Sequence, residues 1–154
     1  MVFLKQLKYE QAEYHFRRAI EINTSNSVLY CNLGMVLHAR KQYQEALEVL
    51  NQALSINPKN SIAKFKRAIV LCSLGEYKAS LEELEHLRNL APKEPSLYFA
   101  IGKILKKLKR KTEALWYLSN ALDLDPRNST KIKSAFDSIS DLNENEDEEF
   151  ELTS

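Results

Sequence analysis

Glycine is scarce in this sequence: only three of its 154 residues are glycine, and four are proline. Antiparallel sheets joined by tight turns need more glycine, because many turn positions require a positive φ. Residues that favour helices, namely Leu, Ala, Glu, Lys, Arg and Gln, dominate the middle of the chain. The composition therefore predicts an all-α fold, and the length suits a single globular unit.

Long apolar runs are also lacking. No stretch approaches the roughly 18 apolar residues that a membrane-spanning helix needs. The N-terminus has no succession of charged, apolar and small residues of the kind that marks a signal peptide. We therefore expect no membrane partner and a location in the nucleus and cytoplasm.

Cysteine and histidine are too few and too scattered to indicate a metal or catalytic centre. Cys31 and Cys72 are isolated, which argues against both a disulfide framework and a C-x-x-C site. His15, His38 and His86 have no partner at ligand spacing, although Cys31 and His38 could share a helix face. Three glycines cannot build a glycine-rich phosphate loop. We expect no enzyme, no catalytic residues, no metal and no cofactor.

The chain has one strongly acidic segment. Residues 141–154 carry seven acids and no base, so residues 1–140 carry +8 within a chain of net charge +1. This composition predicts a disordered acidic tail. Just before it, the run KILKKLKRK forms one basic helix stripe, made of Lys103, Lys106, Lys107 and Arg110. The stripe is either a solvated face or a site for an acidic or carboxylate partner. We expect no nucleic acid, because no aromatics are interleaved for base stacking.

The same amphipathic pattern returns at a constant interval, the one that separates Ala12 from Ala46. Small residues recur in two columns, Ala12, Ala46, Ser80, Ala114 and Ala19, Ala53, Leu87, Ala121, the second broken once by leucine. Large apolar residues recur in two others, Phe16, Leu50, Leu84, Leu118 and Ile22, Ile56, Leu90, Leu124. Proline follows at positions 58, 92 and 126. Small residues allow two helix backbones to approach closely, and proline ends the second helix.

A second set of columns lies between the first. Leu37, Leu71 and Leu105 are in register, as are Gly34, Ala68 and Gly102. Each unit is therefore two helices, and the predicted pairs are 27–40 with 43–56, 61–74 with 77–90, and 95–108 with 111–124. Residues 129–140 have the spacing of a short amphipathic capping helix, whose Ile132, Phe136 and Ile139 should lie on the last pair.

These columns resemble the tetratricopeptide repeat (TPR), a 34-residue helix–turn–helix unit with small residues at its eighth, twentieth and twenty-seventh positions. The resemblance implies a superhelical solenoid of α-hairpins. Its expected boundaries are a partial repeat at 1–26, repeats at 27–60, 61–94 and 95–128, the capping helix at 129–140 and the tail at 141–154. The departures are Lys64 and Arg67, where apolar residues are usual, and Leu87, where alanine is usual.

The first repeat is incomplete in this sequence. Its first helix would begin seven residues before Met1, so we expect the N-terminal edge to expose Phe3, Leu4 and Leu7. The chain then reads as a fragment of a longer array, and self-association through this edge is expected.

Several stretches that lie outside the TPR consensus resemble one particular family of TPR proteins. KFKRA, ELEHLRNLAPKE and YFAIGK are similar to the C-terminal repeats of the family of anaphase-promoting complex subunit three, also called cell division cycle protein 27. This likeness implies a non-catalytic scaffold in a ubiquitin ligase of the mitotic cell cycle. Its groove would receive the C-terminal Ile-Arg tails of activator proteins and contact other subunits. The alternatives are a generic TPR adaptor in another complex and a chaperone co-factor. The chaperone co-factor is disfavoured. Such co-factors hold an acidic C-terminus with a carboxylate clamp of Lys, Asn and Arg side chains. The positions that need these side chains here hold Cys31, Met35, Ser96 and Ala100.

In a TPR superhelix the first helix of each pair lines the groove. The expected peptide-binding residues are Cys31, Asn32, Met35, His38, Phe65, Ile69, Phe99, Lys103 and Lys106, flanked by Val28, Ile62, Cys72 and Ser96. We expect Phe65, Ile69 and Phe99 to surround an aliphatic side chain, with Lys103 and Lys106 near the carboxylate. These first helices hold no Asp or Glu. A ligand arginine would therefore meet backbone carbonyls and Asn32, or acids from upstream repeats.

Overall fold

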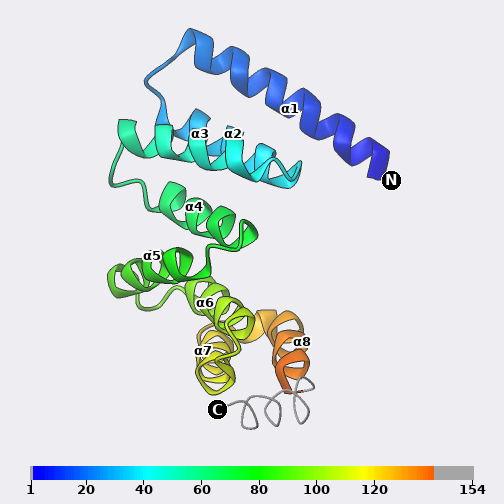
Figure 1. The fold of residues 1–154 in the computed structure, drawn as a ribbon, viewed down its shortest axis with the longest axis vertical. Helices are drawn as coiled ribbons and strands as arrows, with labels where there is room; N and C mark the ends of the chain where they lie inside the picture. Colours follow the sequence, from blue (N-terminus) through cyan, green and yellow to red (C-terminus); the bar gives the residue numbers. More distant parts are fainter. Residues whose placement is uncertain (1, 141–154) are drawn as a thin grey trace. The chain divides into compact units, whose positions relative to one another are not determined.

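The structure, a computed structural model, describes residues 2–140, and within them every regular element is a helix (Figure 1). The elements in chain order are α1 (Val2–Ile22), α2 (Ser27–Ala39), α3 (Tyr43–Ile56), α4 (Ser61–Ser73), α5 (Tyr77–Leu90), α6 (Pro95–Lys107), α7 (Lys111–Leu124), a short 3-10 helix η1 (Pro126–Asn128) and α8 (Ser129–Ser140). The all-α prediction is confirmed. The predicted acidic tail at 141–154 lies outside the described residues.

The helix pairs agree with the predicted ones to within one residue at each end. They are α2 with α3, α4 with α5, and α6 with α7. By its contacts the chain forms two compact units, Met1–Glu83 and Leu84–Ser154, where the composition predicted one. Repeats pack chiefly on their sequence neighbours, so a repeat array has no single central core. None of the described helices combines the length and apolar character needed to span a bilayer.

The N-terminal segment differs from the expected partial pair. α1 is one continuous helix of 21 residues, with no turn near residue 7, where the register places one. The sequence there, FLKQLKYEQ, contains neither glycine nor proline to interrupt a helix. Leu4 and Leu7 are 61% and 43% exposed on α1, as the sequence predicts for this edge.

Each turn within a pair has the same backbone geometry. One residue adopts the left-handed conformation, and these residues, Lys41, Gly75 and Lys109, occupy the same position in successive repeats. The N–H of the next residue bonds back across the turn, from Gln42 to Leu37 and likewise in the other two pairs, at 2.9 Å each time. This bond satisfies a carbonyl that the helix end would otherwise leave unpaired.

Asparagine side chains begin two of the first helices. Asn26 accepts a hydrogen bond from the N–H of Val28, and Asn60 accepts one from the N–H of Ala63. Asn60 also donates to the Ser27 hydroxyl (3.0 Å), which in turn donates to the carbonyl of Ala53 (3.0 Å). This chain of bonds joins the start of α4, the start of α2 and the last turn of α3. It fixes the positions of three helix ends without an apolar contact.

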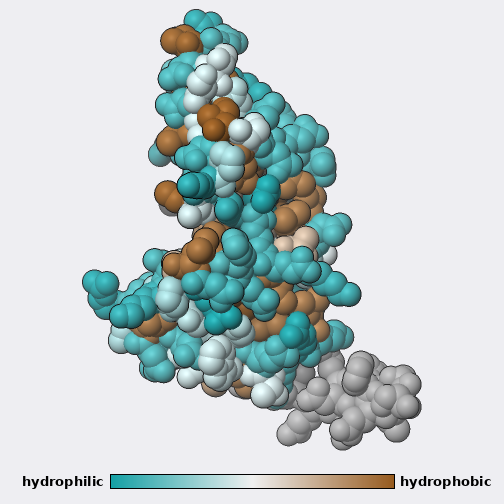
Figure 2. Space-filling model, turned by 90° about the vertical axis from the view of Figure 1, so that its left-hand side faces the viewer, coloured by the Kyte–Doolittle hydropathy of each residue, from teal (hydrophilic) through white to brown (hydrophobic). Residues whose placement is uncertain are grey.

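The core of the first unit lies between α2, α3 and α4. Its buried members are Cys31, Leu33, Leu37, Ala46, Val49, Leu50, Ala53, Leu54, Ala63 and Val70, and Phe16 and Ile20 of α1 pack against them. Gly34 is the close-approach position, because a Cβ there would lie 2.7 Å from Cγ of Leu50. The outer surface is mostly hydrophilic on the face drawn in Figure 2, with hydrophobic side chains emerging at separate places.

The second unit repeats this arrangement. Leu84, Ile101, Ile104, Leu105 and Leu118 are fully buried, and Gly102 allows α6 to approach Leu118. α8 packs on α7 and touches α6 (Figure 1). Its buried residues are Ile132 (4% exposed) and Ile139 (2%). α8 therefore caps the last pair, as the sequence predicts.

Phe136, the third residue expected to lie on the last pair, is not fully buried, because 37% of it is exposed. Phe136 stands one repeat after Gly102, at the position where a small residue lets the second helix of the pair approach.

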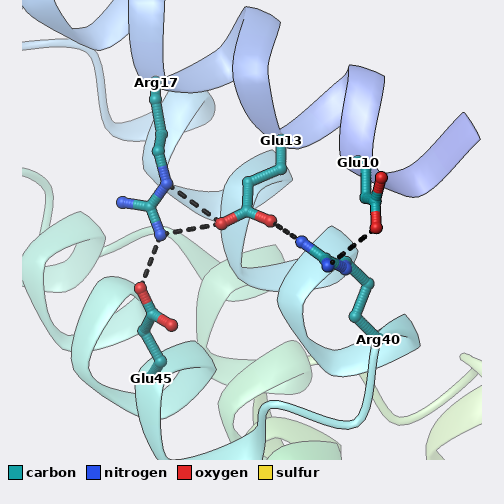
Figure 3. A network of polar contacts seen from close by, with 5 residues as sticks. All are labelled: Glu10, Glu13, Arg17, Arg40 and Glu45. Atoms are coloured by element: carbon teal, nitrogen blue, oxygen red, sulfur yellow. Dashed lines mark hydrogen bonds and ion pairs between the residues drawn. The ribbon is translucent and has the colours of Figure 1, made fainter. Parts of the chain in front are cut away.

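An ion-pair network joins α1 to the first complete pair (Figure 3). Arg17 bonds Glu13 on its own helix (3.0 Å) and Glu45 of α3 (2.5 Å). Arg40, just after α2, pairs with Glu13 and with Glu10 (3.4 Å). Glu13 is the most buried of the five side chains and binds both arginines. The network thus holds α1 in place against α2 and α3 through charged hydrogen bonds.

Candidate peptide-binding surface

The predicted groove residues fall into two sets, one in each unit. Cys31, Asn32, Met35 and His38 belong to α2, and Phe65 and Ile69 to α4, all in the first unit. Phe99, Lys103 and Lys106 belong to α6 in the second unit.

α2 and α4 lie side by side in the first unit and share a polar contact. The ring Nε2 of His38 lies 2.9 Å from the hydroxyl of Ser73 at the end of α4. The ring of Tyr43 also lies close to the imidazole, with ring centroids 5.3 Å apart. Met35, Phe65 and Ile69 are half-buried along the same two helices. The exposed parts of these side chains are apolar, with one imidazole beside them.

Val28 and Ile62 extend this surface towards the helix starts. They occupy the same place in successive repeats, the second position of α2 and of α4, and are 59% and 65% exposed. Single exposed apolar residues are common on protein surfaces, but exposed β-branched residues at equivalent positions of two neighbouring repeats indicate an apolar surface that the repeat pattern produces. We name Val28, Met35, Ile62, Phe65 and Ile69 the first-unit apolar surface.

Cys31 is buried in the core cluster, with 5% exposure, so its thiol offers no surface to a peptide. Burial raises the pKa of the Cys31 thiol, and the positive charge of Lys66 partly opposes this shift. A buried thiol kept protonated behaves as a small apolar core residue.

Lys66 adds a positive charge to this face and is not among the predicted groove residues. Its ammonium lies 5.6 Å from the ring centroid of Phe65. Burial and the charge of Lys66 both lower the pKa of His38, burial being the larger cause. His38 is therefore neutral near pH 7, and Lys66 carries the positive charge. Lys66 stands one repeat after Asn32, a predicted groove residue, so the register could have identified it.

In the second unit Phe99 is flanked by two lysines. The ammonium of Lys103 lies 5.4 Å from the Phe99 ring centroid and that of Lys131, from α8, lies 5.1 Å from it. Lys106 donates a hydrogen bond to the Ser138 hydroxyl of α8 at 2.7 Å. The cap helix thus adds Lys131 to the predicted set and binds Lys106. The spacing of apolar residues in 129–140 predicted α8 as a cap only, without a contribution to the groove.

The first helices α4 and α6 contain lysines, and the first helices of all three pairs contain no Asp or Glu. Lys66 lies against Phe65, Lys103 lies against Phe99, and Lys106 bonds to Ser138. In the residues that the structure describes, none of these lysines has a carboxylate partner. No group of three or more His, Cys, Asp or Glu side chains in residues 2–140 is arranged to hold a metal ion.

Comparison with protein families gives one consistent match. Tetratricopeptide repeat models match residues 1–59, 37–104 and 95–128, so that together they span the chain as far as residue 128. Two solved TPR proteins share the fold. The TPR protein TTC0263 of Thermus thermophilus has a TM-score of 0.74 at 20% identity, covering 87% of this chain and 75% of its own. YrrB, described as a TPR protein with an unusual peptide-binding site, has a TM-score of 0.73 at 22% identity, covering 86% and 69%.

Two curated proteins are similar in sequence. Anaphase-promoting complex subunit 3 of Schizosaccharomyces pombe is 39% identical over 145 residues, which cover 94% of this chain and 22% of that protein. Cell division cycle protein 27 homolog B of Arabidopsis thaliana is 50% identical over 42 residues, 27% of this chain and 6% of that protein. The chain spans less than a quarter of the length of either relative. With its helix pairs, its repeating register and these matches, the chain belongs to the tetratricopeptide repeat family, and its repeats resemble those of anaphase-promoting complex subunit 3.

Proposed function

We propose that this chain is a non-catalytic scaffold of the anaphase-promoting complex that binds C-terminal peptide tails on the first helices of its repeats. The observation that supports this most is the 39% identity to the fission-yeast subunit 3, because it extends over nearly the whole chain. TPR repeats are a protein-interaction scaffold, and the first helices here carry apolar and cationic side chains. The proposed partners are activator proteins and other subunits of the ligase, in the nucleus and cytoplasm.

Each unit, taken by itself, carries groove residues that suit part of such a ligand. The first-unit apolar surface supports binding of an aliphatic side chain, and Lys66 beside it supports binding of a carboxylate. Lys103 and Lys131 offer a second carboxylate site around Phe99. For an Ile-Arg tail, the ligand arginine has no acid to pair with on these first helices. Asn32 and backbone carbonyls are its proposed acceptors in this chain.

The test is fluorescence anisotropy with a labelled peptide ending in Ile-Arg and with its C-terminally amidated form. Charged hydrogen bonds contribute about 1.5–3 kcal/mol each, so Lys66→Glu or Lys103→Glu should weaken binding about tenfold or more at whichever site holds the carboxylate. Lys78→Glu is the matched control, because Lys78 is exposed on the second helix α5. Equal affinity of the free-acid and amidated peptides would exclude a carboxylate site at either lysine.

The alternative is a TPR adaptor of another complex, a chaperone co-factor included. An acidic chaperone-type C-terminal peptide, titrated in parallel, separates the two. Tighter binding of that peptide than of the Ile-Arg peptide would favour the alternative and count against the scaffold assignment.

We also propose self-association through the N-terminal edge. Leu4 and Leu7 are exposed one turn apart on α1, and covering them would contribute roughly 25 cal/mol per Å² of apolar area. Sedimentation should show concentration-dependent association that Leu4→Glu reduces. A monomer at high concentration, unchanged by this substitution, would contradict the proposal.

A further inference from the structure

Three lysines of the second unit form one connected group, which we name the α6–α8 lysine cluster: Lys103, Lys106 and Lys131. Phe99 joins Lys103 to Lys131 through its ring, and Ser138 joins Lys106 to α8. Lys103 and Lys106 stand one turn apart on α6, and Lys131 and Ser138 stand two turns apart on α8. The cluster therefore lies along the contact of the two helices.

This group of charges is poorly balanced by its own helices. α6 contains three lysines and no acid, and α8 contains two lysines and one acid, Asp137. In the part of the chain that the structure describes, none of the three cluster lysines has an ion-pair partner. Two ammonium groups at one ring repel each other, and an anion between them would remove that repulsion. The cluster thus favours an acidic ligand.

The chain itself supplies an acidic segment beside the cluster. Residues 141–154 carry seven acids and no base, and they follow Ser140, the last residue of α8, directly. Ser138, which binds Lys106, is only three residues before the first of these acids, Asp141. A 14-residue segment can reach roughly 46 Å, more than the length of about 18 Å that a 12-residue helix spans, so it can reach back to Lys131.

We propose that the acidic segment 141–154 binds the α6–α8 lysine cluster of its own chain and competes there with acidic ligands from other proteins. The short attachment gives the segment a high effective concentration, of the order of millimolar. Ion pairs at an exposed surface are individually weak and are screened by salt. The contact is therefore reversible, and an external ligand with better geometry displaces it. This inference holds whether or not the ligand of the chain is an Ile-Arg tail.

The first test measures, residue by residue and by mass spectrometry, how fast the lysine side chains react with an acylating reagent. The neutral amine is the form that reacts, so a bound carboxylate, which favours the protonated ammonium and covers it, slows the reaction. The full chain is compared with a full-length variant in which the seven acids are replaced by their amides, Asp141→Asn and Glu144→Gln among them. We expect Lys103 and Lys131 to react at least twofold faster in the variant at low salt. In 0.5 M NaCl this difference should vanish.

Lys64 and Lys78 of the first unit are the internal controls and should react at equal rates in both proteins. Glu82→Gln, which removes an exposed acid from α5, is the matched control variant and should leave Lys103 and Lys131 at the wild-type rate. Equal rates of Lys103 and Lys131 with and without the seven acids at low salt would overturn the proposal.

The second test identifies which chain provides the acids. Carbodiimide treatment of an equimolar mixture of ¹⁴N- and ¹⁵N-labelled full chain should join acids of 141–154 to Lys103 or Lys131 within single-isotope pairs. If the copies exchange freely, crosslinks made entirely between two copies would give about half mixed-isotope pairs. A mixed-isotope share approaching one half would therefore mean that a second copy supplies the acids, and the intramolecular proposal would fail. Crosslinks spread equally over lysines of the first unit would also overturn it, because they indicate attraction without a site.

Discussion

Arg67 and Glu83 form a two-pronged ion pair between α4 and α5. The Arg67 Nη2 lies 2.6 Å from Glu83 Oε1, and its Nε lies 3.0 Å from the same oxygen. One period earlier the two positions hold Leu33 and Val49, both buried, and one period later Ile101 and Tyr117. A charged pair thus replaces an apolar pair in the middle repeat, and Arg67 also donates to Asn51 of α3 (3.2 Å).

This pair predicts strong coupling in a double-mutant cycle. Arg67→Leu alone leaves the part-buried Glu83 carboxylate unpaired, and Glu83→Val alone leaves the guanidinium unpaired. Each should lower the free energy of unfolding by about 1–3 kcal/mol. The double variant, which restores the apolar pair of the neighbouring repeats, should be within about 1 kcal/mol of the wild type. Urea denaturation measures all four proteins, and a double variant that simply adds the two losses would contradict the coupling.

Lys41 predicts a stabilising substitution. Its φ is 63°, in the left-handed region, where a side chain costs about 1–2 kcal/mol, whereas Gly75 occupies the equivalent turn at 82°. Lys41→Gly should raise the free energy of unfolding by about 0.5–1 kcal/mol, because glycine also makes the unfolded chain more flexible. The reverse change, Gly75→Ala, should lower it by a similar amount. If both substitutions destabilise in the same denaturation assay, turn strain does not control stability here.

Most of the fold could be predicted from the sequence, because the repeating register fixes the helix pairs independently of tertiary contacts. The register could not predict the continuity of α1. The only sequence feature that indicates a continuous helix there is the absence of glycine and proline between Phe3 and Gln11. The register also showed that Arg67 departs from the repeat pattern, but it was not used to find the residue that pairs with Arg67. Leu33 and Val49 have the same separation as Arg67 and Glu83, so the register could have identified Glu83 as the partner.

The candidate site was less predictable, for a reason visible at Phe99. The sequence could place Phe99 and Lys103 on one helix face by their spacing. That Lys131 approaches the same ring depends on how α8 lies against α6, which no spacing specifies. For Cys31 the register predicted too much. Its place in the repeat predicts a groove residue, but large neighbouring side chains enclose it in the core.

Burial in α8 predicts which residues hold the cap. Ile139→Ala should lower the free energy of unfolding by about 2–4 kcal/mol, because Ile139 is almost completely buried. Phe136→Ala should cost clearly less, about 1 kcal/mol, because over a third of this residue is already exposed. Thermal denaturation compares the two variants. A greater loss for Phe136→Ala would show that its ring, and not Ile139, anchors the helix.

His38 predicts a dependence of stability on pH. Burial, and to a lesser extent Lys66, lower the pKa of His38 in the folded chain below its ordinary value of 6.5. The unfolded chain therefore takes up a proton at higher pH than the folded chain does. The stability that neutral His38 contributes is complete above about pH 6.5 and is lost as the pH falls below it. The slope cannot exceed about 1.4 kcal/mol per pH unit for one proton.

His38→Gln tests this directly, because an amide can still bond to the Ser73 hydroxyl but does not titrate. The free energy of unfolding, measured in urea at pH 7.5, 6.5 and 5.5, should fall less steeply with acidification in this variant than in the wild type. His86→Gln, on the exposed face of α5, is the matched control and should keep the wild-type slope. If His38→Gln also keeps that slope, the loss of stability in acid comes from groups other than the α2–α4 contact.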